Sequence, residues 1–211
     1  MDGVVSLTPE TPGNGLPYRD LSFAQALQDL NTINMLQALL ILAINTICAL
    51  CPGFACELWN HYSNGTGEDF NIDPRVILRD EFADAVEYER RILAEKAARA
   101  CSGPVGTVCT VEVDSLWRTV NFEKSGDLQF GVGHMRYRLR GTCTVTVGER
   151  GSDVSAVYSL DVYKDWNFDG GKAVGGVSLD LFAAMQFYGV GQEFRMFGTA
   201  TGFQYLTWVS R

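Results

Sequence analysis

The periodicity of apolar residues changes once along this chain, near Gly103–Gly106, and this change constrains the fold more than any other feature. Before it, apolar residues recur every three or four positions, as in helices that bury one face; after it they alternate, as in strands. Helices followed by a run of strands are typical of an α+β domain. We therefore expect a linker-like segment over residues 1–20 and a single domain over 21–211, helical over about 21–103 and β-rich over about 106–211, with a twisted antiparallel sheet or a partial β-barrel.

The helical half contains a long apolar stretch. We expect a helix over Ser22–Leu30, with Ser22 as its cap, followed by a second helix over Met35–Cys51. A helix that crosses a bilayer needs about 20 largely apolar residues, so the second stretch has nearly that length. Two interpretations remain open: a helix buried on nearly all sides of a soluble core, which we favour, and a helix that enters a membrane.

Residues 57–73 are rich in Gly and Asn and predict a loop, after which a long helix begins. Asp73 precedes Pro74, and Asp at the cap with Pro at the first helical position is a strong helix start. We expect the helix from about Arg75 to Ala100, ended by Gly103. Its expected buried face consists of Val76, Leu78, Phe82, Val86, Ile92 and Leu93.

The clearest β-pattern is a hairpin formed by Leu128–Val147 and Val154–Trp166. With the turn centred between Arg150 and Gly151, residues on one face of the two strands become neighbours. The expected pairs are Arg140 opposite Asp161, Arg138 opposite Tyr163 and Arg136 opposite Asp165, with His134 on the same face. The other expected elements are a strand over Thr107–Val113, a helix over Ser178–Tyr188 and strands over Gln192–Phe197 and Phe203–Val209.

Charge and the first residues limit the classes of partner. The formal net charge is -8, which argues against a broad electrostatic grip on nucleic acid and against adhesion to an anionic membrane surface. Residues 1–15 have neither the basic start nor the apolar core of a signal peptide. We therefore expect a module of a larger carrier protein, or export without a cleaved leader, and no nucleic acid partner.

The six cysteines leave several arrangements open. Cys101 and Cys109 flank a short loop and are the pair most suited to a disulfide; the alternative is two buried free thiols. A zinc site is a further candidate, but we favour cysteines that pack as small apolar residues. Its four ligands would be Cys48, Cys51, Cys56 and His61.

The polar face of the hairpin is the main candidate for chemistry. Asp165 and Asp161 offer acid/base groups, His134 offers a titratable imidazole, and Arg136 offers a guanidinium suited to phosphate. The alternative, favoured on general grounds, is a solvated sheet face with ion pairs of little individual worth. Asn167 follows the second strand in a segment of acids and glycines, Asp165–Lys172, where functional loops commonly lie.

A second candidate lies in the expected loop before Asp73. There His61 and Glu68 would form a base and its orienting partner. A structured turn without catalytic function is the favoured alternative. The sequence specifies no cofactor for either candidate.

Two stretches resemble the C-terminal toxin domains of bacterial polymorphic toxins, the group that includes Rhs-type and type VI secretion effectors. They are His61–Asp73 and Tyr163–Lys172, the latter continuing through Gly189–Phe194 to Phe197-Gly198. The resemblance implies release from a larger carrier protein, a cognate immunity protein, and delivery into the periplasm or inner membrane of a target bacterium.

The segment around Asp161, Tyr163 and Asp165 is also distantly similar to the acidic motif of colicin M-like enzymes, which cleave a lipid-linked peptidoglycan precursor. In that motif a His-Arg pair follows, whereas no histidine follows Asp165 here, so His134 would have to substitute. The resemblance implies hydrolysis of a phosphodiester or pyrophosphate in a lipid-linked substrate. In that reaction Asp165 would activate water, Asp161 would assist and His134 would act as acid/base. Substrate would be bound by Arg136, Tyr163 and Asn167. The alternatives are a membrane-inserting, pore-forming toxin and a non-catalytic binding module.

Overall fold

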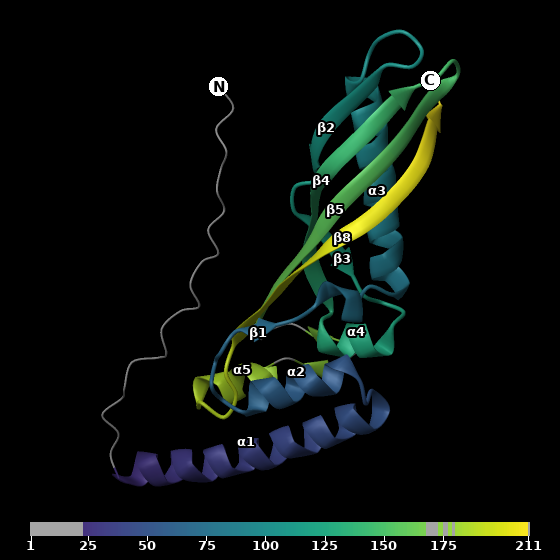
Figure 1. Cartoon of the computed structure of the whole chain (residues 1–211). Helices are drawn as coiled ribbons and strands as arrows, with labels where there is room; N and C mark the ends of the chain where they lie inside the picture. Colours follow the sequence, from purple (N-terminus) through teal and green to yellow (C-terminus); the bar gives the residue numbers. More distant parts are fainter. Residues whose placement is uncertain (1–22, 168–172, 175–176, 179, 211) are drawn as a thin grey trace.

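The structure is a computed structural model that describes residues 23–167, 173–174, 177–178 and 180–210. It confirms the α+β class: five helices pack beside and below one open sheet of six strands (Figure 1). The expected linker and the Ser22 cap lie outside the described residues.

The elements of the first half are α1 (Phe23–Leu50), α2 (Phe54–Ser63), β1 (Phe70–Asn71), the 3-10 turn η1 (Pro74–Val76) and α3 (Asp80–Ala100). Those of the second half are β2 (Val108–Asp114), β3 (Arg118–Asn121), α4 (Gly126–Gly131), β4 (His134–Val147), β5 (Gly151–Trp166), β6 (Ala173–Val174), β7 (Val177–Ser178), α5 (Asp180–Phe187) and β8 (Phe194–Ser210).

The main sheet has the strand order β1-β8-β5-β4-β2, and β3 also pairs with β4. Its neighbours are antiparallel except for β1, which runs parallel to β8. Of the two expected arrangements, the open twisted sheet is the one found. Strands β6 and β7 form a separate two-stranded sheet.

The β4–β5 hairpin forms as expected, but the expected register is wrong by two residues. Arg136 lies opposite Tyr163, and Arg138 lies opposite Asp161. The turn is centred one residue earlier, because Gly148 N–H donates to the Gly151 carbonyl at 2.8 Å. An even shift keeps the same side chains on the same face, because side chains alternate with period two.

The first expected hairpin strand begins too early in the sequence. Residues 126–131 form α4, with Leu128 and Val132 both buried against the core. Their spacing of four residues fits one helix face, and it also fits the alternation of a strand. The pattern in so short a segment therefore did not distinguish the two.

The two closing strands expected near the C-terminus are one continuous strand, β8. Tyr158 pairs with Phe203 and Leu160 pairs with Ala200, so β8 has one residue more than β5 between these pairs. This extra residue forms a β-bulge, at which Gly202 adopts a positive φ of 80°. Up to Ala200 the even-numbered residues face the core; beyond Gly202 the odd-numbered residues do. The bulge therefore reverses the inward face of the strand.

Helix α3 covers the inner face of the sheet (Figure 1), but it begins later than expected. Asp73 does cap the chain, accepting the Arg75 N–H at 3.0 Å, yet the turn it caps is the 3-10 turn η1. The helix proper starts at Asp80, and Val76 is exposed instead of buried. Its buried residues are Phe82, Val86, Glu89, Leu93, Ala94 and Ala97.

The Gly/Asn-rich loop expected over 57–73 is wrong in its first part, which is helix α2. The Asp127 carboxylate of α4 accepts hydrogen bonds from the N–H groups of Phe54 and Ala55 at 3.2 and 2.8 Å, so a distant residue caps this helix. Leu58 and Tyr62 are fully buried along its inner face. The final helix also starts later than expected: Ser178 lies in β7, and α5 begins at Asp180.

Candidate functional site: an apolar surface helix and a polar sheet face

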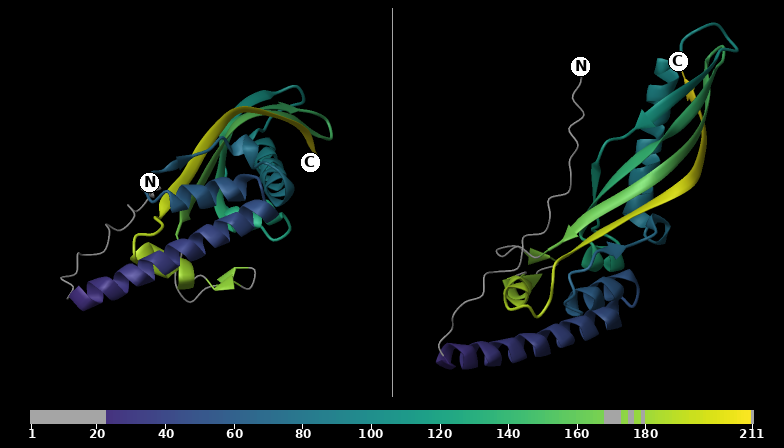
Figure 2. Two further views of the ribbon diagram at one scale, coloured as in Figure 1. Left: turned by 90° about the horizontal axis from the view of Figure 1, so that it is seen from below. Right: turned by 60° about the vertical axis from the view of Figure 1, so that its left-hand side comes forward.

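The two helices expected before residue 51 are one continuous helix, α1, of 28 residues. It lies across α2 and α5 at the end of the molecule farthest from the tip of the sheet (Figures 1 and 2). No Gly or Pro interrupts its sequence, so nothing ends the first helix at Leu30.

The favoured expectation that this helix is buried on nearly all sides is wrong. Between Asp29 and Leu50, the fully buried side chains are Leu36, Leu40 and Ile44, one narrow stripe at spacing four. Ile33, Leu39 and Ile47 flank this stripe and are partly buried, and large apolar side chains on the opposite surface point to solvent. Their exposed fractions are 55% for Met35, 61% for Ile41, 63% for Leu42 and 72% for Leu50.

Of the helices that the structure describes, α1 is the one long and apolar enough to cross a membrane, over Asp29–Leu50. Those 22 residues span about 33 Å at 1.5 Å per residue, which matches a hydrocarbon core of about 30 Å. After Asp29 the stretch holds no charged residue. Its Thr46 hydroxyl donates to the Leu42 carbonyl at 2.8 Å, so this polar group is satisfied within the helix.

A disulfide joins the two ends of the α1–α2 turn. Cys48, in the last turn of α1, is bonded to Cys56, in the first turn of α2, across Pro52 and Gly53. The zinc site is thereby excluded, because two of its four ligands are consumed. Of the two alternatives left open for Cys101 and Cys109, the disulfide is the one found.

The polar residues predicted on the hairpin do share one face of the sheet, the face away from α3. We call this the outer face. Asp161 is 7% exposed and accepts from Arg140 Nε and Thr199 Oγ1, each at 2.8 Å. Asp165 is exposed and accepts the Tyr163 hydroxyl at 2.5 Å. The Asp161 carboxylate is therefore held by its neighbours in an ion pair.

The remaining predicted residues lie at the end of this face. His134 begins β4 and Asn167 follows β5; both are exposed. Continuing the hairpin register would set His134 opposite Asp165, but the paired ladder ends at Arg136 and Tyr163. A shallow hollow does occur on the outer face, at the other end of the sheet, lined by Thr144, Thr146, Asp153, Val154, Ser155, Leu206 and Thr207. It does not adjoin the predicted catalytic residues.

The Tyr163 phenol is a sensitive probe of this face. Burial, followed by its hydrogen bond to Asp165, raises the pKa of Tyr163 to about 12. The folded state therefore holds the phenol proton more tightly than the unfolded state does. Its contribution to the free energy of unfolding is complete below pH 10.0, the ordinary pKa of tyrosine, and is lost as the pH rises to about 12.

We expect Asp165→Asn to move the Tyr163 transition part of the way back towards 10, because burial remains while the carboxylate is gone. Absorbance titration measures the change, and Tyr163→Phe identifies which transition belongs to this residue. An unchanged transition in Asp165→Asn would contradict the hydrogen bond.

The second predicted pair is not formed through its side chains. His61 Nε2 lies 2.7 Å from the backbone carbonyl of Glu68, and its ring packs against Phe70 and Phe194. The Glu68 carboxylate therefore does not orient His61 as the partner of a catalytic base. His61 instead ties α2 to the strand that follows.

Sequence reasoning missed the short strand β3 and the turn before it. Leu116, 69% exposed, has a positive φ of 59°, and Trp117 follows it at the edge of the outer face. Ser115 Oγ accepts the Leu139 N–H at 2.9 Å and fixes this turn on β4. Strand β3 has only four residues, and Val120 is the one apolar residue among them. So short a segment shows no clear alternation, and the sequence therefore gave no strong indication of a strand there.

Comparisons with models of protein families, with curated proteins and with solved structures find no match to this chain.

Proposed function

We propose that this chain is a membrane-active toxin domain, directed at the envelope of a target bacterium, that engages the bilayer through α1. The observation that carries the proposal is the exposed apolar surface of a helix long enough to span the hydrocarbon core. Soluble proteins rarely leave such a surface in water unless it meets a partner or a membrane. The toxin part of the proposal is supported by the resemblance of residues 61–73 and 163–172.

The energetic case rests on four side chains. Burying a large aliphatic side chain in an apolar medium gains about 1.5–3 kcal/mol. Met35, Ile41, Leu42 and Leu50 are each more than half exposed, so transfer of α1 to lipid recovers several kcal/mol. The stripe of Leu36, Leu40 and Ile44 would leave the protein core, but it would enter an equally apolar solvent.

The two disulfides agree with an envelope location, because disulfides persist in oxidising compartments such as the periplasm. Cys48 lies at the C-terminal end of α1, so the α+β domain that follows would remain on the oxidising side of the membrane. A carrier protein and an immunity protein are the partners that this proposal includes.

Hydrolysis of a lipid-linked phosphodiester on the outer face is the second candidate. The register favours it, because β4, β5 and β8 bring His134, Asp165 and Arg195 towards one end of the sheet. Against it, enzyme sites are usually concave, whereas these groups lie on an open face, where Asp165 already accepts from Tyr163 and Arg195 already pairs with Asp69. We therefore place the membrane function first.

Vesicle flotation tests the proposal. The full chain is mixed with phosphatidylcholine vesicles, and we expect it to float with the lipid, less so when anionic lipid is added, because the net charge is -8. Release of an entrapped dye would show that binding perforates the bilayer. A chain that stays with the soluble fraction, as a monomer or as an oligomer joined through α1, would overturn the proposal.

A further inference from the structure

A row of side chains crosses the outer face at the level of Tyr163. Its backbone neighbours are Arg136 on β4 and Phe197 on β8. At the β3 edge, the Trp117 ring lies 6.4 Å from the Tyr163 ring, edge to face, and the Arg136 guanidinium lies 5.6 Å from the centre of the Trp117 ring. Phe197 is 38% exposed. We call Trp117, Arg136, Tyr163 and Phe197 the aromatic row.

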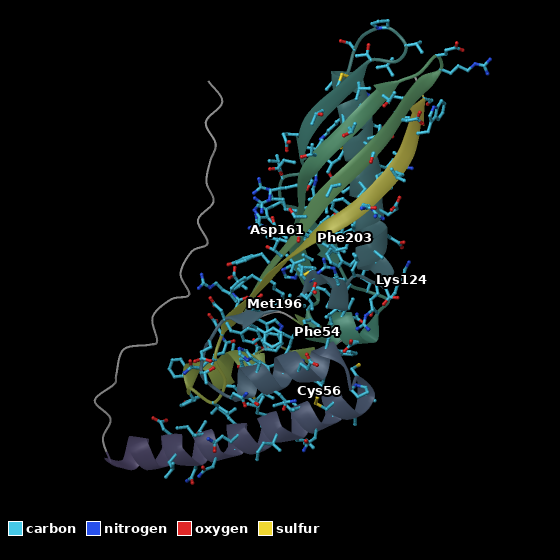
Figure 3. All side chains as sticks on the ribbon, viewed as in Figure 1. Phe54, Cys56, Lys124, Asp161, Met196 and Phe203 are labelled. Atoms are coloured by element: carbon cyan, nitrogen blue, oxygen red, sulfur yellow. A yellow bond between two sulfur atoms is a disulfide. The ribbon has the colours of Figure 1, made fainter. Side chains whose placement is uncertain are left out.

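The charges flanking the aromatic row are balanced. Arg138 pairs with Asp114, Arg140 pairs with Asp161, and Arg195 pairs with Asp69. Figure 3 shows the nitrogen-rich side chains near the labelled Asp161 on this side of the sheet. Arg136 within the row and the exposed Asp165 beside it add one charge of each sign, so the surface favours neither a strongly anionic nor a strongly cationic ligand.

We infer that the aromatic row is a binding platform for a neutral saccharide. One face of a pyranose ring presents C–H groups, which pack on the electron-rich faces of aromatic rings. Its rim presents hydroxyl groups, which donate to carboxylates and accept from guanidinium groups. The exposed Phe197 ring and the accessible parts of the half-buried Trp117 and Tyr163 rings supply the first kind of contact, and Asp165 with the neighbouring ion pairs supplies the second.

The turn before β3 contributes to this platform. Leu116 is held at a positive φ that a branched aliphatic residue rarely adopts, and it projects into solvent next to Trp117. The Leu116 N–H donates to Asp114 Oδ1 at 2.8 Å, so the turn is tied to the Asp114–Arg138 pair. Strained residues that surrounding contacts maintain are concentrated at binding surfaces.

This inference does not depend on α1, so it is tested without lipid. Chitohexaose and cellohexaose, two neutral oligosaccharides, are titrated into the full chain, with calorimetry and tryptophan fluorescence as readouts. We expect binding of at least one of them with a dissociation constant of about 1 mM or tighter. Trp117→Ala and Tyr163→Ala should each weaken it about tenfold, whereas Tyr163→Phe, which keeps the ring, should retain most of it.

Trp208→Ala is the matched control, because Trp208 is 56% exposed on β8 at the opposite end of the sheet. Circular dichroism confirms that each variant is folded. The inference is overturned if neither oligosaccharide binds, if Trp208→Ala is the variant that loses binding, or if inorganic pyrophosphate binds the platform and neither oligosaccharide does. The last result would favour the hydrolase instead.

Discussion

Two acidic residues on the exposed face of α1, Ile41→Asp with Leu42→Asp, are expected to abolish membrane binding. Both positions lie near the middle of the Asp29–Leu50 span and point away from the protein. An Asp at the centre of a membrane helix costs about 3 kcal/mol, which lowers partitioning more than about a hundredfold for each substitution. Vesicle flotation should therefore leave the variant entirely with the soluble fraction.

Ile41 and Leu42 are chosen because they are exposed, so a charge there should weaken membrane binding without unfolding the protein. Leu40 and Ile44, equally apolar in sequence, are 3% and 8% exposed, so charges there would unfold the docked helix and give an ambiguous loss. Ile41→Ala with Leu42→Ala should keep most of the binding, and Val105→Asp, in an exposed loop, should keep all of it. Continued flotation of the Asp variant would contradict the role of α1.

The same variants separate the two candidate functions in living bacteria. Expressed in the periplasm, the Ile41→Asp, Leu42→Asp chain should lose toxicity while Asp165→Ala keeps it. The reverse result would favour hydrolysis on the outer face. Growth unaffected by the soluble, unaltered chain in both periplasm and cytoplasm would remove the toxin assignment.

Removal of the Cys48–Cys56 disulfide should increase vesicle binding. The bond ties the end of α1 to the start of α2, so it restricts how far α1 can move towards lipid while α2 stays packed on the domain. A cross-link that closes so short a loop restricts the released state by about 2–3 kcal/mol, equivalent to a factor of about 50. We expect Cys48→Ser with Cys56→Ser to bind vesicles faster and at lower lipid concentration.

The second disulfide provides a matched control, because Cys101–Cys109 has the same sequence separation of 8 but joins α3 to β2. Cys101→Ser with Cys109→Ser should leave vesicle binding as it is and lower the free energy of unfolding. Equal vesicle binding by the Cys48→Ser, Cys56→Ser variant and the unaltered chain would show that α1 engages lipid without leaving α2.

The sequence predicts the fold where one period persists over many residues. The β4–β5 hairpin, the helix around Phe82–Ala100 and the Cys101–Cys109 loop are all recognisable because local pattern and tertiary packing agree. It fails where a distant residue decides the local structure. The Asp127 carboxylate caps α2 from another helix, and no pattern within residues 54–63 announces that partner.

The candidate sites show the same division. Alternation placed the arginines and aspartates on one face even with the register wrong, because an even shift preserves the face. The exposure of α1 could not be predicted from the sequence, because an apolar helix has the same sequence whether protein, lipid or water surrounds it. Trp117 was missed because its position depends on the short strand β3.

The extra residue near Gly202 switches which side chains of β8 face inward, while β4 and β5 keep the same inward residues along their whole length. Deleting that residue would turn Leu206 and Trp208 towards α3 and bring Tyr205 to the water, while Arg195, Phe197 and Thr199 kept their places. Chain length at this one point, and not the identity of the side chains, therefore decides what the far end of the sheet displays.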